Sequence, residues 1–192
     1  KDLADHVRKV DQGQLDTTAI QDMAHKTAGR AGLLGFRALS DASARLDHAV
    51  RHDQWVAAAL DDWMQEARQR GLETARMVEF STMVYGADNF QLVSIKAVSN
   101  QYPLRGKVEY QEGATAPRQT VGHGPGPGEV WVNPRLLRLL ELEVGGSLEV
   151  GNHQLSIAGL LVREPDGGFR MSSLAPRVMM HVDDVASTEV IK

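Results

Sequence analysis

Hydrophobic positions in the first 70 residues repeat at helical spacing. After Asp16 they recur every three or four residues, on what would be one buried face of a helix: Ile20, Ala24, Thr27, Ala31 and Leu34. His25 falls on the opposite face. Similar patterns predict a short helix over 3–10, a helix capped by Ser40 and Asp41 with Ala42, Leu46, Ala49 and Val50 inward, and a fourth helix over 56–64. Four helices with short connections predict an antiparallel bundle.

After Gly71 the pattern changes to short alternating segments separated by Pro/Gly turns. These segments predict strands over 77–84, 91–98, 129–132, 147–150, 155–162 and near 178–181. Asn133 is a good N-cap with Pro134 at the first helical position, which predicts a short helix through Leu140. Gly151-Asn152 predicts a hairpin turn. The fold class is therefore α+β, an N-terminal antiparallel helical bundle followed by a mixed β-rich domain with short helices.

Composition narrows the possible partners and compartments. The chain has 192 residues and 42% hydrophobic content, enough to bury a core. Its net charge of −4 offers no basic field for nucleic acid, so no nucleic-acid partner is expected. The absence of cysteine excludes disulfides and thiolate metal sites and fits a cytoplasm and a periplasm equally well. No apolar run approaches the roughly 20 residues that span a bilayer. Because the chain begins at Lys1, without an initiator Met or a signal pattern, we expect a piece of a longer protein.

The strongest candidate for chemistry is the segment from Ala24 to Phe36, AHKTAGRAGLLGF. Glycine inside a helix costs roughly 1 kcal/mol relative to alanine, so Gly29 and Gly32 need an explanation. On a helix these two glycines share a face with His25, which places an imidazole above a patch without side chains. Such a surface allows another protein to bring a phosphorylated carboxylate close to the ring nitrogen.

This segment resembles the histidine phosphotransfer (HPt) module of bacterial phosphorelays, and the likeness continues through 39–51. The resemblance implies that His25 is the phospho-acceptor, that Lys26, Gly29 and Gly32 form the receiver-docking face, and that a receiver domain is the partner. Neutral imidazole is a competent nucleophile near pH 7. One position departs from the motif, because the family often has Lys where this chain has Ala28. The alternative is that the two glycines mark a close helix crossing and that His25 is merely exposed.

The other polar residues predict no enzyme. His48 and His52 lie four residues apart beside Asp47, but without a His-Glu-x-x-His pattern, so we expect no zinc and no other metal or cofactor. His6, His123, His153 and His181 are predicted to be solvated side chains. The adjacent pairs Asp61-Asp62 and Asp183-Asp184 point in different directions and suit capping and solubility. No nucleophile elbow, phosphate-binding loop or Rossmann glycine pattern is present.

A second resemblance covers about 130 residues from Asp62 onward. Its stretches are DWMQEAR at 62–68, EFSTMV at 79–84, QLVSIKAV at 91–98, YPLRG at 102–106, PGEVWVNPRLL at 127–137, VGGSL at 144–148 and LAPRVMM at 174–180. These look like the extracytoplasmic domain of MacB/FtsX-type ABC-transporter permeases, in the YbbP-like branch. In that family the domain relays nucleotide-driven motion to lipid or lipoprotein export, and a separate ATPase subunit hydrolyses ATP.

The two resemblances predict a two-part chain, with an HPt-like helical module at 1–61 and an incomplete permease-like domain at 62–192. The permease resemblance implies a non-catalytic scaffold, a periplasmic location, and an ATPase subunit and membrane helices as partners in the parent protein. The HPt resemblance implies a cytoplasmic phosphorelay protein that carries a phosphoryl group on His25. The permease resemblance already begins near Asp62, inside the predicted fourth helix, so the helical module is expected to lack a complete last helix of its own. The primary interpretation is the export-permease domain, and the alternative is the phosphorelay protein.

Overall fold

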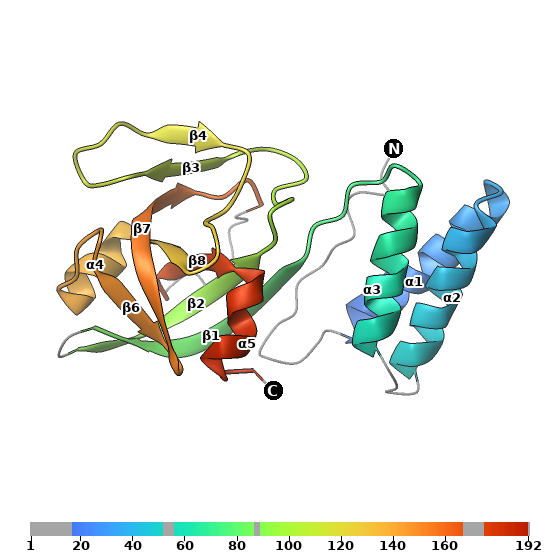
Figure 1. The fold of residues 1–192 in the computed structure, drawn as a ribbon, viewed down its shortest axis with the longest axis horizontal. Helices are drawn as coiled ribbons and strands as arrows, with labels where there is room; N and C mark the ends of the chain where they lie inside the picture. Colours follow the sequence, from blue (N-terminus) through green and yellow to red (C-terminus); the bar gives the residue numbers. More distant parts are fainter. Residues whose placement is uncertain (1–16, 52–55, 87–88, 167–174, 192) are drawn as a thin grey trace. The chain divides into compact units, whose positions relative to one another are not determined.

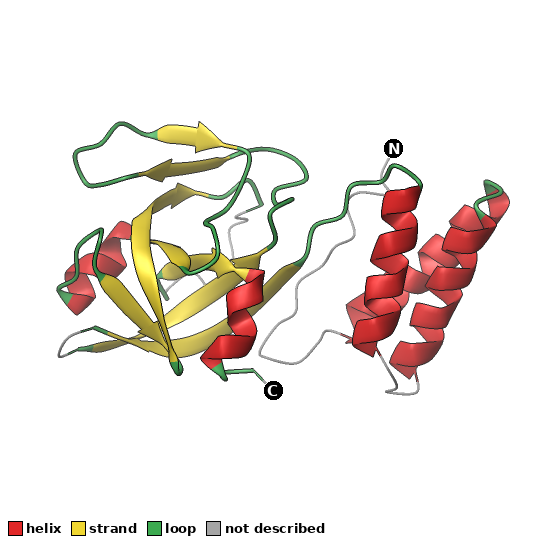
Figure 2. Ribbon diagram, in the orientation of Figure 1, coloured by secondary structure: helices red, strands yellow, loops and turns green. Residues whose placement is uncertain are grey.

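The computed structural model describes residues 17–51, 56–86, 89–166 and 175–191, without the side chains of 17–19, 56 and 57. The described chain forms two compact units that divide between Thr74 and Ala75. The first unit is helical and the second is built on a β-sheet (Figure 1, Figure 2). The fold is thus α+β, as the hydrophobic pattern predicts.

The helical unit contains α1 (Thr17–Leu33), α2 (Arg37–Arg51) and α3 (Val56–Gln69). These correspond to three of the four predicted helices, and the predicted helix over 3–10 lies outside the described residues. Buried side chains from the three helices form two small apolar clusters, one with Ile20, Ala24, Leu46 and Val50 and one with Ala31, Leu39 and Ala67. Trp63 packs against both clusters, and its indole N–H donates to Ser43 Oγ at 2.9 Å.

Two details of the predicted helices are wrong. Leu34 was expected on the buried face, but α1 ends at Leu33 and the Leu34 side chain is exposed. The helical period no longer applies once the chain turns at Gly35, whose φ is +78°. Ser40 and Asp41 were expected to cap the next helix, whereas α2 begins at Arg37 and contains both. The Ser40 hydroxyl instead donates to the Ala28 carbonyl at 2.8 Å.

The second unit is an eight-stranded sheet with the order β4-β3-β7-β5-β8-β2-β1-β6. Its strands are β1 (Met77–Tyr85), β2 (Phe90–Val98), β3 (Val108–Gln111), β4 (Gln119–Val121), β5 (Glu129–Val132), β6 (Ser147–Val150), β7 (His153–Arg163) and β8 (Arg177–His181). Strand β6 pairs with both β1 and β7, so six of these strands close into a ring. The pairs β2–β8 and β5–β7 are parallel, and the others are antiparallel.

The main core lies inside this ring. Alternate residues of the ring strands point inward, including Val93, Ile95 and Ala97 of β2, as the period of two predicts for a strand. Helix α4 (Pro134–Leu140) packs Leu136 and Leu140 against this core. A 3-10 helix, η2 (Val182–Asp184), and α5 (Val185–Thr188) add Val182 and Val185. A second cluster on the outer face contains Val98, Tyr102, Val108, Trp131 and Met179.

The local predictions for this unit are largely confirmed. All six predicted strands are present within a few residues, and α4 has the predicted bounds with Asn133 as its N-cap. The outer hairpin of β3 and β4 and the short α5 were not predicted. No helix in the described parts of the chain is long and apolar enough to cross a bilayer.

Candidate functional site

His25 lies on the exposed side of α1, as its position opposite the apolar face predicts. Its side chain is 71% exposed, and its Nδ1 lies 3.9 Å from Asp47 Oδ2 of α2. The same Asp47 oxygen lies 2.9 Å from Arg51 Nη2. The structure thus places the imidazole at the surface, beside an acidic residue that one arginine already holds.

The residues predicted to surround His25 are all exposed. Lys26 Nζ forms an ion pair with Asp22 Oδ2 at 2.5 Å on the same helix. A Cβ added to Gly29 would meet no atom within 4 Å, so a close helix crossing does not explain this glycine. A Cβ added to Gly32 would lie 3.4 Å from Ser40 Oγ of α2, an ordinary contact. The helix surface beside the imidazole is therefore exposed.

The other histidines of the described residues differ in how exposed they are. His48 lies in α2 and His52 lies outside the described residues. Among the described residues no group of three His, Cys, Asp or Glu side chains could hold a metal ion. His123 is exposed, as predicted. The prediction of a solvated His181 is wrong, because this ring is buried at the end of β8, with its Nε2 3.1 Å from Asn100 Oδ1.

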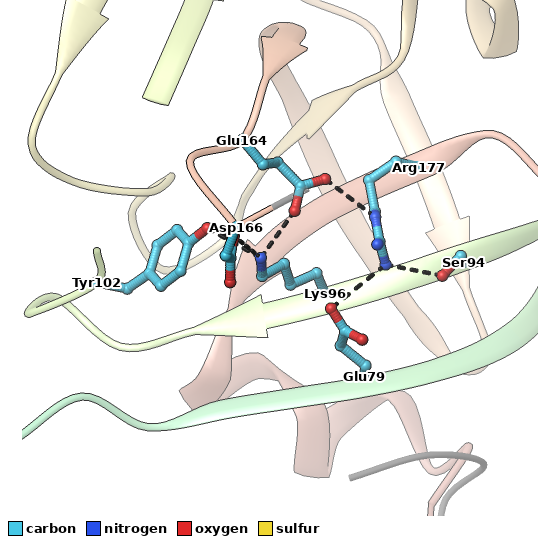
Figure 3. A network of polar contacts seen from close by, with 7 residues as sticks. All are labelled: Glu79, Ser94, Lys96, Tyr102, Glu164, Asp166 and Arg177. Carbon is cyan, nitrogen blue, oxygen red and sulfur yellow. Dashed lines mark hydrogen bonds and ion pairs between the residues drawn. The ribbon is translucent and has the colours of Figure 1, made fainter. Parts of the chain in front are cut away.

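The sheet unit contains a charged cluster that the sequence analysis did not identify (Figure 3). At its centre is Lys96 of β2, whose side chain is only 1% exposed. Its Nζ donates to Tyr102 Oη at 2.9 Å, to Glu164 Oε2 at 2.8 Å and to Asp166 Oδ1 at 2.5 Å. An ammonium group has three N–H donors, so these three bonds use all of them.

A second cation completes this Lys96 cluster. Arg177 of β8 lies with its Nε 3.0 Å from Glu164 Oε1, so Glu164 bridges the lysine and the arginine. Arg177 Nη1 donates to Ser94 Oγ at 2.8 Å and lies 3.7 Å from Glu79 Oε1 of β1. The cluster therefore joins β1, β2 and β8 to the segment that follows β7 (Figure 3).

Strand register explains why these groups meet. On β2, Ser94 and Lys96 alternate with the inward residues Val93, Ile95 and Ala97, so they face outward from the ring. In the sheet register, Lys96 of β2 lies opposite Glu79 of β1, and Ser94 of β2 lies opposite Arg177 of β8. Tyr102 follows β2 and approaches the same outer face. The polar outer face of β2 is therefore covered by other parts of the chain.

The electrostatics of the Lys96 cluster favour one protonation state. Burial raises the pKa of Tyr102, and the hydrogen bond and negative charge of Asp166 raise it further, so its hydroxyl stays protonated. That hydroxyl donates to Asp166 Oδ1 at 2.6 Å. Burial alone would raise the pKa of Asp166, but the hydrogen bonds from Lys96 and Tyr102 and the lysine charge outweigh it and leave this pKa below its usual value. The cluster is thus a lysine and an arginine among three carboxylates.

This arrangement suits structure better than catalysis. A lysine acts as a nucleophile or base only when it gives up a proton and has a lone pair to offer. The Lys96 ammonium instead has a partner for each N–H and lies out of reach of solvent. The bonds hold the start of the segment after β7 against the outside of the ring.

Sequence reasoning missed the cluster because its partners are far apart in the chain. Glu164 and Asp166 lie 68 and 70 residues after Lys96, and Arg177 lies 83 residues after Ser94. A lysine at an outward position of a strand is normally solvated, so no local signal marks it. The only hint is a lone cation in an otherwise uncharged strand, FQLVSIKAV.

Comparison with known proteins relates most of the chain to a transporter. An ABC transporter permease of Escherichia coli (strain K12), YbbP, described as uncharacterized, is 38% identical to this chain over 146 residues. The match covers 76% of this chain, but the chain spans only 17% of the permease. No family model matches the chain, and no solved structure matches it significantly. Most of the chain is therefore related to a segment of an ABC transporter permease.

The length of this match shows that the similarity reaches into the helical unit. The match covers 146 residues, whereas 62–192 holds 131. Any continuous stretch of that length in this chain must contain residues 47–146, which include all of α3 as well as β1 to β5. The permease similarity therefore begins before Asp62, where the sequence motifs placed its start.

Proposed function

We propose that the chain is a non-catalytic scaffold and motion-relay segment of an ABC-type export permease, located outside the cytoplasm. The similarity to YbbP supports the permease part of this proposal. In the parent protein the partners would be membrane helices and an ATPase subunit, and a lipid or lipoprotein would be the exported substrate.

The observation that carries the relay role is the Lys96 cluster. A segment that transmits movement must keep its shape under load, which requires connections between elements that are distant in the chain. The cluster supplies them, since Glu164 binds Lys96 of β2 and Arg177 of β8, while Arg177 also approaches Glu79 of β1. Ring closure through β6 adds a second connection. Both features favour a sheet unit that moves as one body.

The location can be tested by labelling an introduced cysteine. The chain has no cysteine, and Lys107 is exposed in the sheet unit, so Lys107→Cys provides a single accessible thiol. In a cysteine-free parent permease, a membrane-impermeant maleimide should label this thiol in intact spheroplasts. Val93→Cys, at a fully buried position, is the matched control and should react only after denaturation. Labelling of Lys107→Cys only after lysis would place the segment in the cytoplasm and refute the proposal.

The relay role can be tested by hydrogen exchange. In the parent permease bound to its ATPase subunit, a non-hydrolysable ATP analogue should leave amide protection within β1 to β8 unchanged, because a rigid body moves without opening. The Lys96→Met variant should show nucleotide-dependent loss of protection in β2 and β8, where the cluster is broken. A nucleotide-dependent change inside the sheet of the unaltered protein would contradict the rigid relay.

A second candidate function is phosphotransfer through His25. The observation that favours it is the exposed imidazole beside the open surface at Gly29. Phosphorylated receiver domains mixed with the full chain should then leave acid-labile label on it. The label should be lost in His25→Gln but retained in His48→Gln, a control on the neighbouring helix. Absence of label with every receiver tried would remove this candidate.

A further inference from the structure

The turn between α1 and α2 exposes an unusual amount of apolar surface. Leu33 is 90% exposed, Leu34 is 63% exposed and Phe36 is 44% exposed. These are three large apolar side chains within four residues, interrupted only by Gly35. Exposed apolar side chains mark interaction sites when they form a patch.

The end of α3 lies beside this turn. Arg70 places its guanidinium 5.7 Å from the centre of the Phe36 ring, and Leu72, also exposed, follows it in the chain. Below the surface, Ala31, Leu39 and Ala67 form the cluster that joins all three helices. We call the exposed residues Leu33, Leu34 and Phe36 the turn surface.

The charged residues nearest to the turn surface along the chain are basic, whereas the carboxylate of Glu66 is paired with Arg70 and that of Asp22 with Lys26. From Met23 to Ser40 the chain contains no Asp or Glu but carries Lys26, Arg30 and Arg37, although the whole chain has a net charge of −4. Arg30 and Arg37 are exposed, and among the described residues no carboxylate pairs with either one. The turn surface is therefore an apolar projection beside two exposed arginines, Arg30 and Arg37, that pair with no carboxylate of the described residues.

The backbone N–H groups of this turn already have hydrogen-bond acceptors. The N–H groups of Leu34, Gly35 and Phe36 donate to the carbonyls of Arg30, Gly32 and Ala31 at 2.8 to 3.1 Å. Each unsatisfied backbone group that enters an apolar medium costs several kcal/mol. Because these N–H groups have partners, they add little to the cost of moving the turn out of water.

We propose that the turn surface docks on an anionic lipid bilayer, with Leu33, Leu34 and Phe36 in the interface and Arg30 and Arg37 at the headgroups. Leucine and phenylalanine next to basic residues are the composition of segments that lie in a membrane interface. A protein partner would need its own acidic and apolar groups in matching places, whereas an anionic bilayer presents both everywhere on its surface. This inference does not depend on the proposed relay role.

Vesicle flotation of the full chain tests this inference. We expect the chain to float with phosphatidylcholine vesicles that contain about 30% phosphatidylglycerol, and much less with phosphatidylcholine alone, since anionic lipid attracts each nearby cation. Arg30→Gln with Arg37→Gln should lower the apparent affinity by roughly 25-fold, at about fivefold for each arginine. High salt should reduce binding by screening these charges.

Apolar variants separate insertion from simple charge attraction. Leu33→Ser with Leu34→Ser and Phe36→Ser should abolish flotation, and Leu33→Ser alone should weaken it. Phe90→Ser with Leu92→Ser, which removes two other exposed large apolar side chains from the sheet unit, is the control and should float like the unaltered chain. Circular dichroism checks that each variant is folded. Flotation unaffected by the triple variant, equal flotation with neutral vesicles, or a stable dimer that the triple variant dissolves would each overturn the proposal.

Discussion

Lys96 shows how much a single residue depends on its surroundings. At 1% exposure, its charge is stabilised by the hydroxyl and the two carboxylates around its Nζ. A buried cation without partners would be costly. The same residue type behaves differently at Lys26, where an ion pair with Asp22 is half-exposed on a helix.

Replacing Lys96 should therefore be costly. In Lys96→Met the carboxylates of Glu164 and Asp166 lose their shared cation, which should lower the free energy of unfolding by about 3–5 kcal/mol. Lys26→Met breaks an exposed pair of the same type and should cost less than about 1 kcal/mol. Urea unfolding of both variants measures the difference. Equal small effects would show that the Lys96 cluster contributes little to stability.

The Lys96 cluster should also make the free energy of unfolding fall at acidic pH. The pKa of Asp166 is lowered in the folded state, so its contribution to stability is complete above its unfolded value of 3.8 and is lost as the pH falls toward the lower folded value. Asp166→Asn has no carboxyl to protonate. Its unfolding free energy should depend less steeply on pH below about pH 4 than that of the unaltered chain. Parallel slopes for the two proteins in this range would contradict the assignment.

At the scale of elements, caps and turns account for the boundaries that could be read from the sequence. Asn133 Oδ1 accepts a hydrogen bond from the Arg135 N–H at 2.9 Å, and Pro134 occupies the first turn of α4. The α1 boundary was less visible. Its apolar period continues to Leu34, although the helix has already ended.

The cap of α4 provides a test at this scale. Asn133→Ala removes the side-chain acceptor and should lower the free energy of unfolding by about 1 kcal/mol. Asn133→Asp keeps an acceptor at the helix N-terminus and should be nearly neutral. Thermal unfolding followed by circular dichroism compares the two variants. If Asn133→Asp lost as much stability as Asn133→Ala, the amide group and not capping would matter at this position.

At the scale of the whole molecule, the two units have separate cores. The helical unit is held by Ile20, Ala24, Leu46 and Val50, with a second cluster near Trp63, whereas the sheet unit is held by the inside of its ring and by the outer cluster around Trp131. Units with independent cores can open independently.

A core substitution in one unit should then leave the other protected. Leu46 is fully buried, and Leu46→Ala should cost about 2–5 kcal/mol in the helical unit. Hydrogen exchange read by mass spectrometry should show faster exchange in α1, α2 and α3 and unchanged exchange in β1 to β8. Faster exchange throughout both units would show that they unfold together.

The sequence by itself determined most of the elements of this protein and the buried faces of its helices and strands. Periods of two and 3.6 identified the strands and helices, and cap and turn residues located α4 and the Gly151 turn, because these signals act over a few residues. It also placed His25 on an exposed face.

Only the tertiary structure decided which outward-facing residues are buried and what they meet. Lys96 and His181 occupy positions that a local pattern assigns to solvent, and Leu34 occupies one that it assigns to a core. Their environments depend on sheet order, on ring closure through β6 and on the chain turn after α1. These features arise from contacts between residues up to 83 positions apart, which no local period encodes.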